Sequence, residues 1–132
     1  MTQDTPRISL FCDCVCSGFL NANPSPGQGG ARVANYGLID QLAALHWVQQ
    51  AAPLFGGDPS RVTLMGHGSG AACVQFLVAS PAATPGLFQR AVLLSGSALS
   101  RWSLVENPAD NAIRLAKKLN CSLPKVRIND LC

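Results

Sequence analysis

Two glycines four residues apart, Gly66 and Gly70, lie between an expected strand and an expected helix. A strand that runs through G-x-x-x-G into a helix is the frame of a nucleophile elbow, a tight turn that in hydrolases presents a serine to a carbonyl carbon. The flanking glycines avoid side-chain collisions there, and the central residue is held in a strained conformation. In this sequence the central residue is Gly68, which has no nucleophilic atom.

No neighbouring residue replaces the missing hydroxyl. Centring the motif on Ser69 would put His67 and Ala71 where the glycines belong, and would direct the hydroxyl one residue further along the helix. A serine nucleophile also needs an aligned base within hydrogen-bond reach. The two histidines, His46 within a helix and His67 within the turn, are not placed to serve as that base. We therefore predict no catalytic residue and a degenerate elbow formed by Gly66, His67, Gly68, Ser69 and Gly70.

A glycine-rich turn before a helix could instead cradle a phosphate group. This turn lacks the lysine of G-x-x-x-x-G-K-[ST], and its three glycines alternate instead of following G-x-G-x-x-G. The alternating cysteines Cys12, Cys14 and Cys16 fit neither a C-x-x-C redox pair nor a zinc site, since no histidine lies near them. We predict no cofactor and no metal, and a turn that lets the strand and helix pack closely.

The elements around the turn follow from apolar periodicity. Leu38, Leu42, Leu45 and Val48 form one stripe of a helix that Pro53 ends. Strand, helix and strand then follow within about thirty residues, which predicts a βαβ unit with parallel strands. The expected helices cover residues 36–51, 71–79 and 108–119, and the expected strands cover residues 8–15, 61–65 and 91–94.

The composition is that of a protein interior. Of the 132 residues, 48% are hydrophobic and 13% are charged, against about 25% charged in globular domains. Since parallel strands are buried on both faces, further strands and helices are expected outside this sequence. The net charge of +3 gives no case for nucleic acid, and the cations Arg114, Lys117 and Lys118 suit a solvated helix face. No stretch is long and apolar enough for a membrane span, and the polar start lacks a signal-peptide pattern.

Besides the elbow, a series of short motifs runs along the chain: Asn35-Tyr-Gly-Leu-Ile-Asp-Gln41, Ala44-Leu-His-Trp-Val48, Phe55-Gly-Gly-Asp-Pro59, Arg61-Val-Thr63, Ser80-Pro81, Gly86-Leu-Phe88, Arg90-Ala91 and Ser95-Gly-Ser97. Together these motifs resemble the type-B carboxylesterase/cholinesterase family. The resemblance implies the α/β class and a partial α/β-hydrolase fold, with a parallel βαβ core around the elbow. Residues 17–132 match a central fragment of that domain, whereas residues 1–16 do not match it.

Glycine at the nucleophile position, within Gly-His-Gly-x-Gly-Ala-Ala-Cys, resembles the neuroligins, and the insect members most. That resemblance implies a non-catalytic adhesion ectodomain whose full-length parent binds a neurexin-like cell-surface protein, forms a homodimer and lies on the extracellular face of the plasma membrane at synapses or junctions. We expect the signal peptide and the membrane anchor of such a parent to lie outside this sequence. The inactive relatives gliotactin, neurotactin and glutactin are similar. An active carboxylesterase and a truncated product without independent function remain the alternatives.

Four further residues carry expectations: Cys121, Cys132, Asn120 and Cys73. From spacing alone, the pairing of Cys121 and Cys132 is open, whereas the family's short disulfide loop implies that they pair. Asn120-Cys-Ser122 is an N-x-[ST] sequon, although its middle cysteine makes it a poor acceptor. Cys73 lies in an apolar helical run and is expected to be a buried small hydrophobe.

Overall fold

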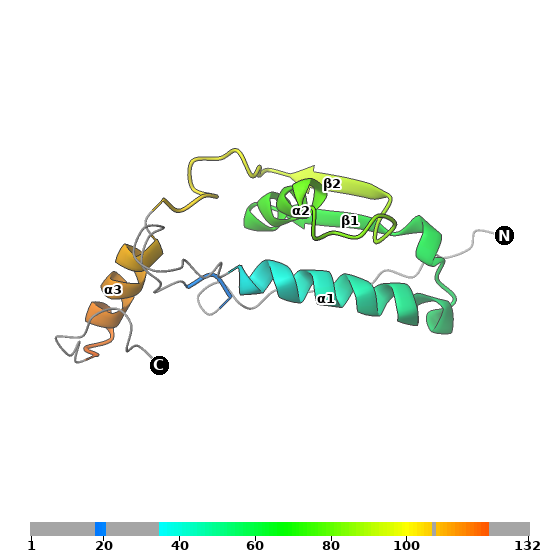
Figure 1. Cartoon of the computed structure of the whole chain (residues 1–132). Helices are drawn as coiled ribbons and strands as arrows, with labels where there is room; N and C mark the ends of the chain where they lie inside the picture. The colour runs from blue at the N-terminus through cyan, green and yellow to red at the C-terminus, as the bar shows by residue number, and fades with distance from the viewer. Residues whose placement is uncertain (1–17, 21–34, 107, 122–132) are drawn as a thin grey trace. The chain divides into compact units, whose positions relative to one another are not determined.

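The computed structural model describes residues 18–20, 35–106 and 108–121 (Figure 1). The helices are α1 (Tyr36–Ala51), α2 (Ser69–Ala79) and α3 (Pro108–Lys118), with 3-10 turns at Ala52–Phe55 and Pro59–Arg61, and the strands are β1 (Thr63–His67) and β2 (Arg90–Leu94). Each predicted helix and both predicted strands of the described region are present. The expected strand at residues 8–15, and the whole segment 1–16, lie outside the described residues.

The chain divides into two compact units, each considered by itself. The first contains the described residues 38–104, which include both strands, α2 and nearly all of α1. The second contains α3 together with the described residues before Leu38. In the second unit the backbone N–H of Gly37 donates to the Gly18 carbonyl oxygen at 2.8 Å. Gly37 also lies against the ring of Phe19, where a Cβ would approach the ring carbons to 2.6 Å.

The first unit is built on the βαβ arrangement that the sequence predicts. Strands β1 and β2 pair in parallel, from Thr63 opposite Arg90 to His67 opposite Leu94, and α2 forms the connection between them (Figure 1). Parallel strands need such a crossover because the end of one strand and the start of the next lie at opposite edges of the sheet. The α/β class and the parallel core are therefore confirmed.

One face of this sheet carries the core. Leu45 of α1, Leu77 of α2 and Leu87 are buried together, and Leu64 of β1 packs against them. The α1 side chain Gln49 ties the helix to two loops, since its Nε2 donates to the carbonyl oxygens of Leu87 at 2.9 Å and Pro59 at 3.0 Å. These contacts hold helix α1 on the same face of the sheet to which the Leu64 side chain points.

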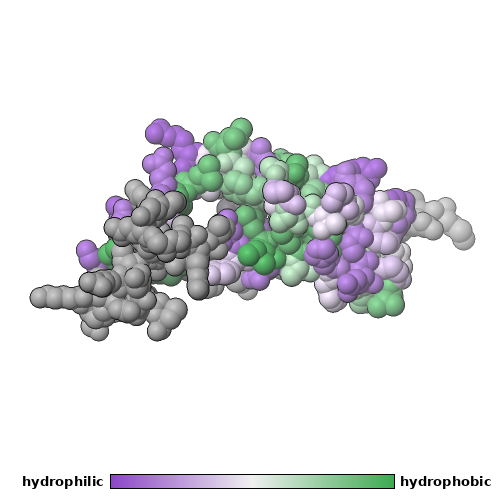
Figure 2. Space-filling view, viewed as in Figure 1, coloured by the Kyte–Doolittle hydropathy of each residue, from purple (hydrophilic) through white to green (hydrophobic). Residues whose placement is uncertain are grey.

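The opposite face of the sheet is exposed in the described part of the chain. Successive side chains of a strand point to opposite faces, so Met65, Val92 and Leu94 point away from Leu64. Their exposed fractions are 71%, 39% and 45%. Apolar side chains also reach the surface elsewhere, as Figure 2 shows for one side of the molecule. Among the described residues, no helix is long and apolar enough to cross a membrane.

Several element boundaries differ from the expectations. Strand β1 begins at Thr63 and not at Arg61, because Arg61 belongs to a 3-10 turn that Asp58 caps by accepting from the Ser60 N–H at 2.9 Å. Helix α2 begins at Ser69, two residues before the expected start. Cys73 in α2 is half-buried and not fully buried.

Candidate functional site

The turn between β1 and α2 has its apex at Gly68. Strand β1 ends at His67, α2 begins at Ser69, and Gly68 has φ 57° and ψ −118°. This is a region of backbone conformation that residues with a Cβ adopt only at a cost of about 1–3 kcal/mol. Glycine adopts it without that cost. An ideal Cβ placed on Gly68 would meet no heavy atom within 4 Å, so the apex has room for a side chain although its backbone disfavours one.

The close approach of strand and helix rests on Gly66. A Cβ on Gly66 would lie 2.2 Å from the carbonyl oxygen of Gly70 and 2.6 Å from the backbone nitrogen of Ala71. Both distances are far below van der Waals contact, and both partners are backbone atoms that cannot rotate away. On Gly70, by contrast, a Cβ would meet nothing within 4 Å outside its own helix. Of the two flanking glycines, only Gly66 must therefore lack a side chain, because a Cβ there would collide with the backbone of Gly70.

Backbone hydrogen bonds hold the apex from both sides. The Gly68 N–H donates to the Leu94 carbonyl oxygen at the end of β2 at 2.9 Å. The Gly68 carbonyl oxygen accepts from the Ala71 N–H at 3.1 Å, in the first turn of α2. Gly96 lies against the same carbonyl group, where a Cβ would come within 2.0 Å of the Gly68 oxygen. The turn thus lies at the carboxyl ends of both strands, the edge at which open α/β sheets bind ligands.

Three side chains near the turn or on α1 could supply a hydroxyl or a base: Ser69, His67 and His46. Ser69 is the exposed first residue of α2, and both His67 at the end of β1 and His46 on α1 are exposed. No hydrogen bond joins any two of these three side chains in the described residues. A poised serine nucleophile needs such a bond to a base. In the described residues, Ser69 is thus not joined to either histidine.

A glutamine that sequence reasoning missed positions the loop beside the apex. The Gln75 Oε1 atom on α2 accepts from the Ser97 hydroxyl and from the Ala98 N–H, both at 2.9 Å. Gln75 thereby fixes the residues that follow Gly96. The partners are more than twenty residues apart in sequence, so no local pattern indicates this contact.

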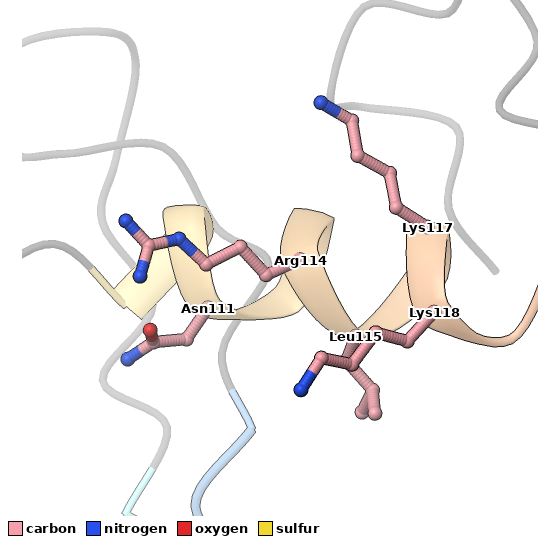
Figure 3. Close-up of a pocket in the computed structure, with 5 residues that line it drawn as sticks. All are labelled: Asn111, Arg114, Leu115, Lys117 and Lys118. Atoms are coloured by element: carbon pink, nitrogen blue, oxygen red, sulfur yellow. The ribbon is translucent and has the colours of Figure 1, made fainter.

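In the second unit, α3 carries a shallow hollow of about 450 Å³ (Figure 3). Its lining residues are Asn111, Arg114, Leu115, Lys117 and Lys118. The three cations are exposed, as expected for a solvated helix face, and they form no ion pair with any described carboxylate. The described residues hold no cluster of metal-ligating side chains.

The predicted disulfide and sequon lie at the end of α3. Asn120 and Cys121 are both exposed. Cys132 and Ser122 lie outside the described residues, so the pairing of Cys121 with Cys132 stays a prediction.

Comparison with known proteins identifies similar sequences in the carboxylesterase family and among the neuroligins. The carboxylesterase family matches residues 17–131. Neuroligin-3 of Homo sapiens, like that of Mus musculus, is 44% identical over 106 residues, which cover 80% of this chain and 12% of the relative. Neuroligin-2 of Homo sapiens is 42% identical over 104 residues, covering 79% of this chain and 12% of the relative. The chain thus spans about one eighth of the length of the curated relatives that it matches.

Proposed function

The chain belongs to the carboxylesterase family, as a neuroligin-like, cholinesterase-like member with a partial α/β-hydrolase fold, and we propose that it is a central fragment of a non-catalytic adhesion domain. In this proposal the segment from residue 17 belongs to the hydrolase-like domain, and Gly68 occupies the position of the nucleophile. The full-length parent binds a neurexin-like cell-surface protein, forms a homodimer and lies on the extracellular face of the plasma membrane.

The observation that carries the proposal is the residue at the apex of the turn. A hydrolase of this fold presents its nucleophile from such a strand-turn-helix, with the following amide near the developing oxyanion. Here the frame is retained, with Gly66 packed against Gly70, but the apex is Gly68 and carries no side chain. Because Ser69 begins the helix and hydrogen-bonds to neither histidine in the described region, the frame has no attacking atom.

The exposed apolar surfaces support the view that this segment is part of a larger domain. A parallel sheet is ordinarily covered on both faces, yet Met65, Val92 and Leu94 are exposed. Helix α1 has a second apolar side, with Ile39 and Trp47 each more than half exposed. A helix with apolar residues all round is typical of a buried position. Further elements of the parent domain are proposed to cover these surfaces.

Labelling with a fluorophosphonate tests the absence of a nucleophile. We expect neither the full-length parent nor this chain to form a serine adduct, and we expect no hydrolysis of a short-chain p-nitrophenyl ester above the rate of a buffer blank. The matched control is Ser69→Ala, which removes the nearest hydroxyl. An adduct that forms on the unsubstituted protein and disappears in Ser69→Ala would overturn the proposal in favour of an active esterase.

Adhesion is tested separately with the full-length parent. Cells that display it should aggregate with cells that display a neurexin-like ectodomain, and soluble ectodomain should inhibit the aggregation. Failure to aggregate with any such partner, in cells where surface staining shows the parent on the plasma membrane, would contradict the adhesion role while leaving the fold unaffected.

A further inference from the structure

The end of helix α3 has a specific backbone geometry. The Cys121 N–H donates to the Ala116 carbonyl oxygen at 3.0 Å, and the Asn120 N–H donates to that of Lys117 at 3.2 Å. Asn120 itself has φ 52°, in the left-handed region. These two bonds with a left-handed residue between them are the Schellman motif, which satisfies the last carbonyl groups of a helix.

Only the backbone of Asn120 takes part in this cap. The side chain is exposed and makes no hydrogen bond to any described residue. Glycine is the residue that most often occupies this position, and asparagine is an accepted second choice because its short polar side chain tolerates the left-handed region. The cap therefore explains why asparagine is tolerated at position 120. It does not involve the carboxamide group, which has no structural role in the described part of the chain.

Asn120 is also the first residue of Asn120-Cys-Ser122, an acceptor pattern for N-linked oligosaccharide, although the middle cysteine makes it a weaker acceptor than most. We propose that Asn120 is glycosylated, a step that rests on the proposed extracellular location, because only a chain that enters the secretory pathway meets the transferase. The Asn120 Nδ2 atom forms a bond to the anomeric carbon of the first sugar. The bond from that carbon to a lipid diphosphate carrier breaks, the diphosphate leaves with the bonding electron pair, and the amide gives up one proton.

The structure accommodates the modification without loss of contacts. A glycan on Nδ2 adds bulk at a solvent-exposed tip, and the two cap hydrogen bonds come from backbone groups that the reaction does not touch. The neighbouring Cys121 is exposed as well.

The test is expression of the full chain in insect cells behind a cleavable leader, with a second sequon in a C-terminal tag that reports translocation. We expect two glycans on the unsubstituted chain, seen as two steps in electrophoretic mobility that peptide-N-glycosidase removes, with Asn120 converted to Asp in the released peptide. Asn120→Gly keeps the helix cap, since glycine favours the left-handed region, and should lose one step. Ser122→Ala keeps Asn120 itself and should lose the same step.

A chain that carries the tag glycan alone would overturn the inference, because it has met the transferase and was not modified at Asn120. The same holds if two steps persist in both Asn120→Gly and Ser122→Ala. Neither outcome bears on the missing nucleophile, which the fluorophosphonate experiment tests independently. Far-ultraviolet circular dichroism of Asn120→Gly should show unchanged helix content, which separates loss of the acceptor from loss of the cap.

Discussion

Replacing the elbow glycines one at a time by alanine should give three different changes in the free energy of unfolding. Each substitution adds the same single methyl group, so the difference comes from the surroundings. For Gly66→Ala the new Cβ would lie 2.2 Å from the Gly70 carbonyl oxygen. Strand β1 and helix α2 must separate to accept it, and we expect a loss of at least about 3 kcal/mol, the upper end for overpacking.

The other two substitutions meet no obstacle and differ through the backbone. At Gly68 the Cβ would find open space, but φ 57° imposes strain, which costs about 1–3 kcal/mol. At Gly70 the residue is helical and a Cβ would meet nothing outside the helix. Alanine there should stabilise the chain by about 0.5–1 kcal/mol, the helix preference of alanine over glycine.

Urea unfolding of the full chain, followed by far-ultraviolet circular dichroism, gives the three values. The expected order of stability is Gly70→Ala, then the unsubstituted chain, then Gly68→Ala, then Gly66→Ala, with an unchanged dependence on urea concentration for the first three. If Gly66→Ala is as stable as Gly68→Ala, the strand does not approach the helix as described. If Gly68→Ala is as stable as the unsubstituted chain, the apex does not lie at Gly68.

Two further predictions concern single side chains. Gln75→Ala removes the acceptor for the Ser97 hydroxyl and the Ala98 N–H; the loss should be about 1–3 kcal/mol in urea unfolding, and no loss would contradict the anchoring role. Hydrogen bonds from Ser60 lower the pKa of the exposed Asp58 carboxyl, so the stability it contributes is present above its unfolded pKa and is lost as the pH falls through the lower folded pKa. Asp58→Asn should therefore reduce the loss of stability as the pH falls below the ordinary carboxyl pKa of 3.8; an identical acid profile for both proteins would refute this contribution.

The elements could be predicted from sequence wherever local patterns specify them. Leu38, Leu42, Leu45 and Val48 lie on one side of α1, and the helix runs over the expected residues. Its end is set by Pro53, which lies within the first turn of the following 3-10 segment. Boundaries were missed where capping decides them: Asp58 holds Arg61 in a short turn, so β1 starts later than its β-branched residues suggest.

The contacts around the turn could not be predicted, because they join residues distant in the chain. Gly96 must be glycine because it touches the Gly68 carbonyl oxygen, yet its local sequence indicates only a turn. In the sequence, Gln49 and Gln75 look like ordinary polar residues of a helix. Only the structure shows the distant loops with which they form hydrogen bonds. Ser95 adopts φ 53° without being glycine or asparagine, and no sequence rule identifies it. The spacing of the residues thus predicts the strand, turn and helix, whereas the contacts that hold them together are seen only in the structure.

The two kinds of glycine in this turn carry different information. Gly66 and Gly96 are required by contacts with backbone atoms, and those contacts exist whether or not the turn performs chemistry. Gly68 is different, since the space around it is open and only its dihedral angles favour glycine. In an enzyme, a serine there would bear the strain in return for its exposed hydroxyl. Under the proposed adhesion role the strain would have no compensating use, and glycine at the apex would remove both the nucleophile and the strain in a single substitution.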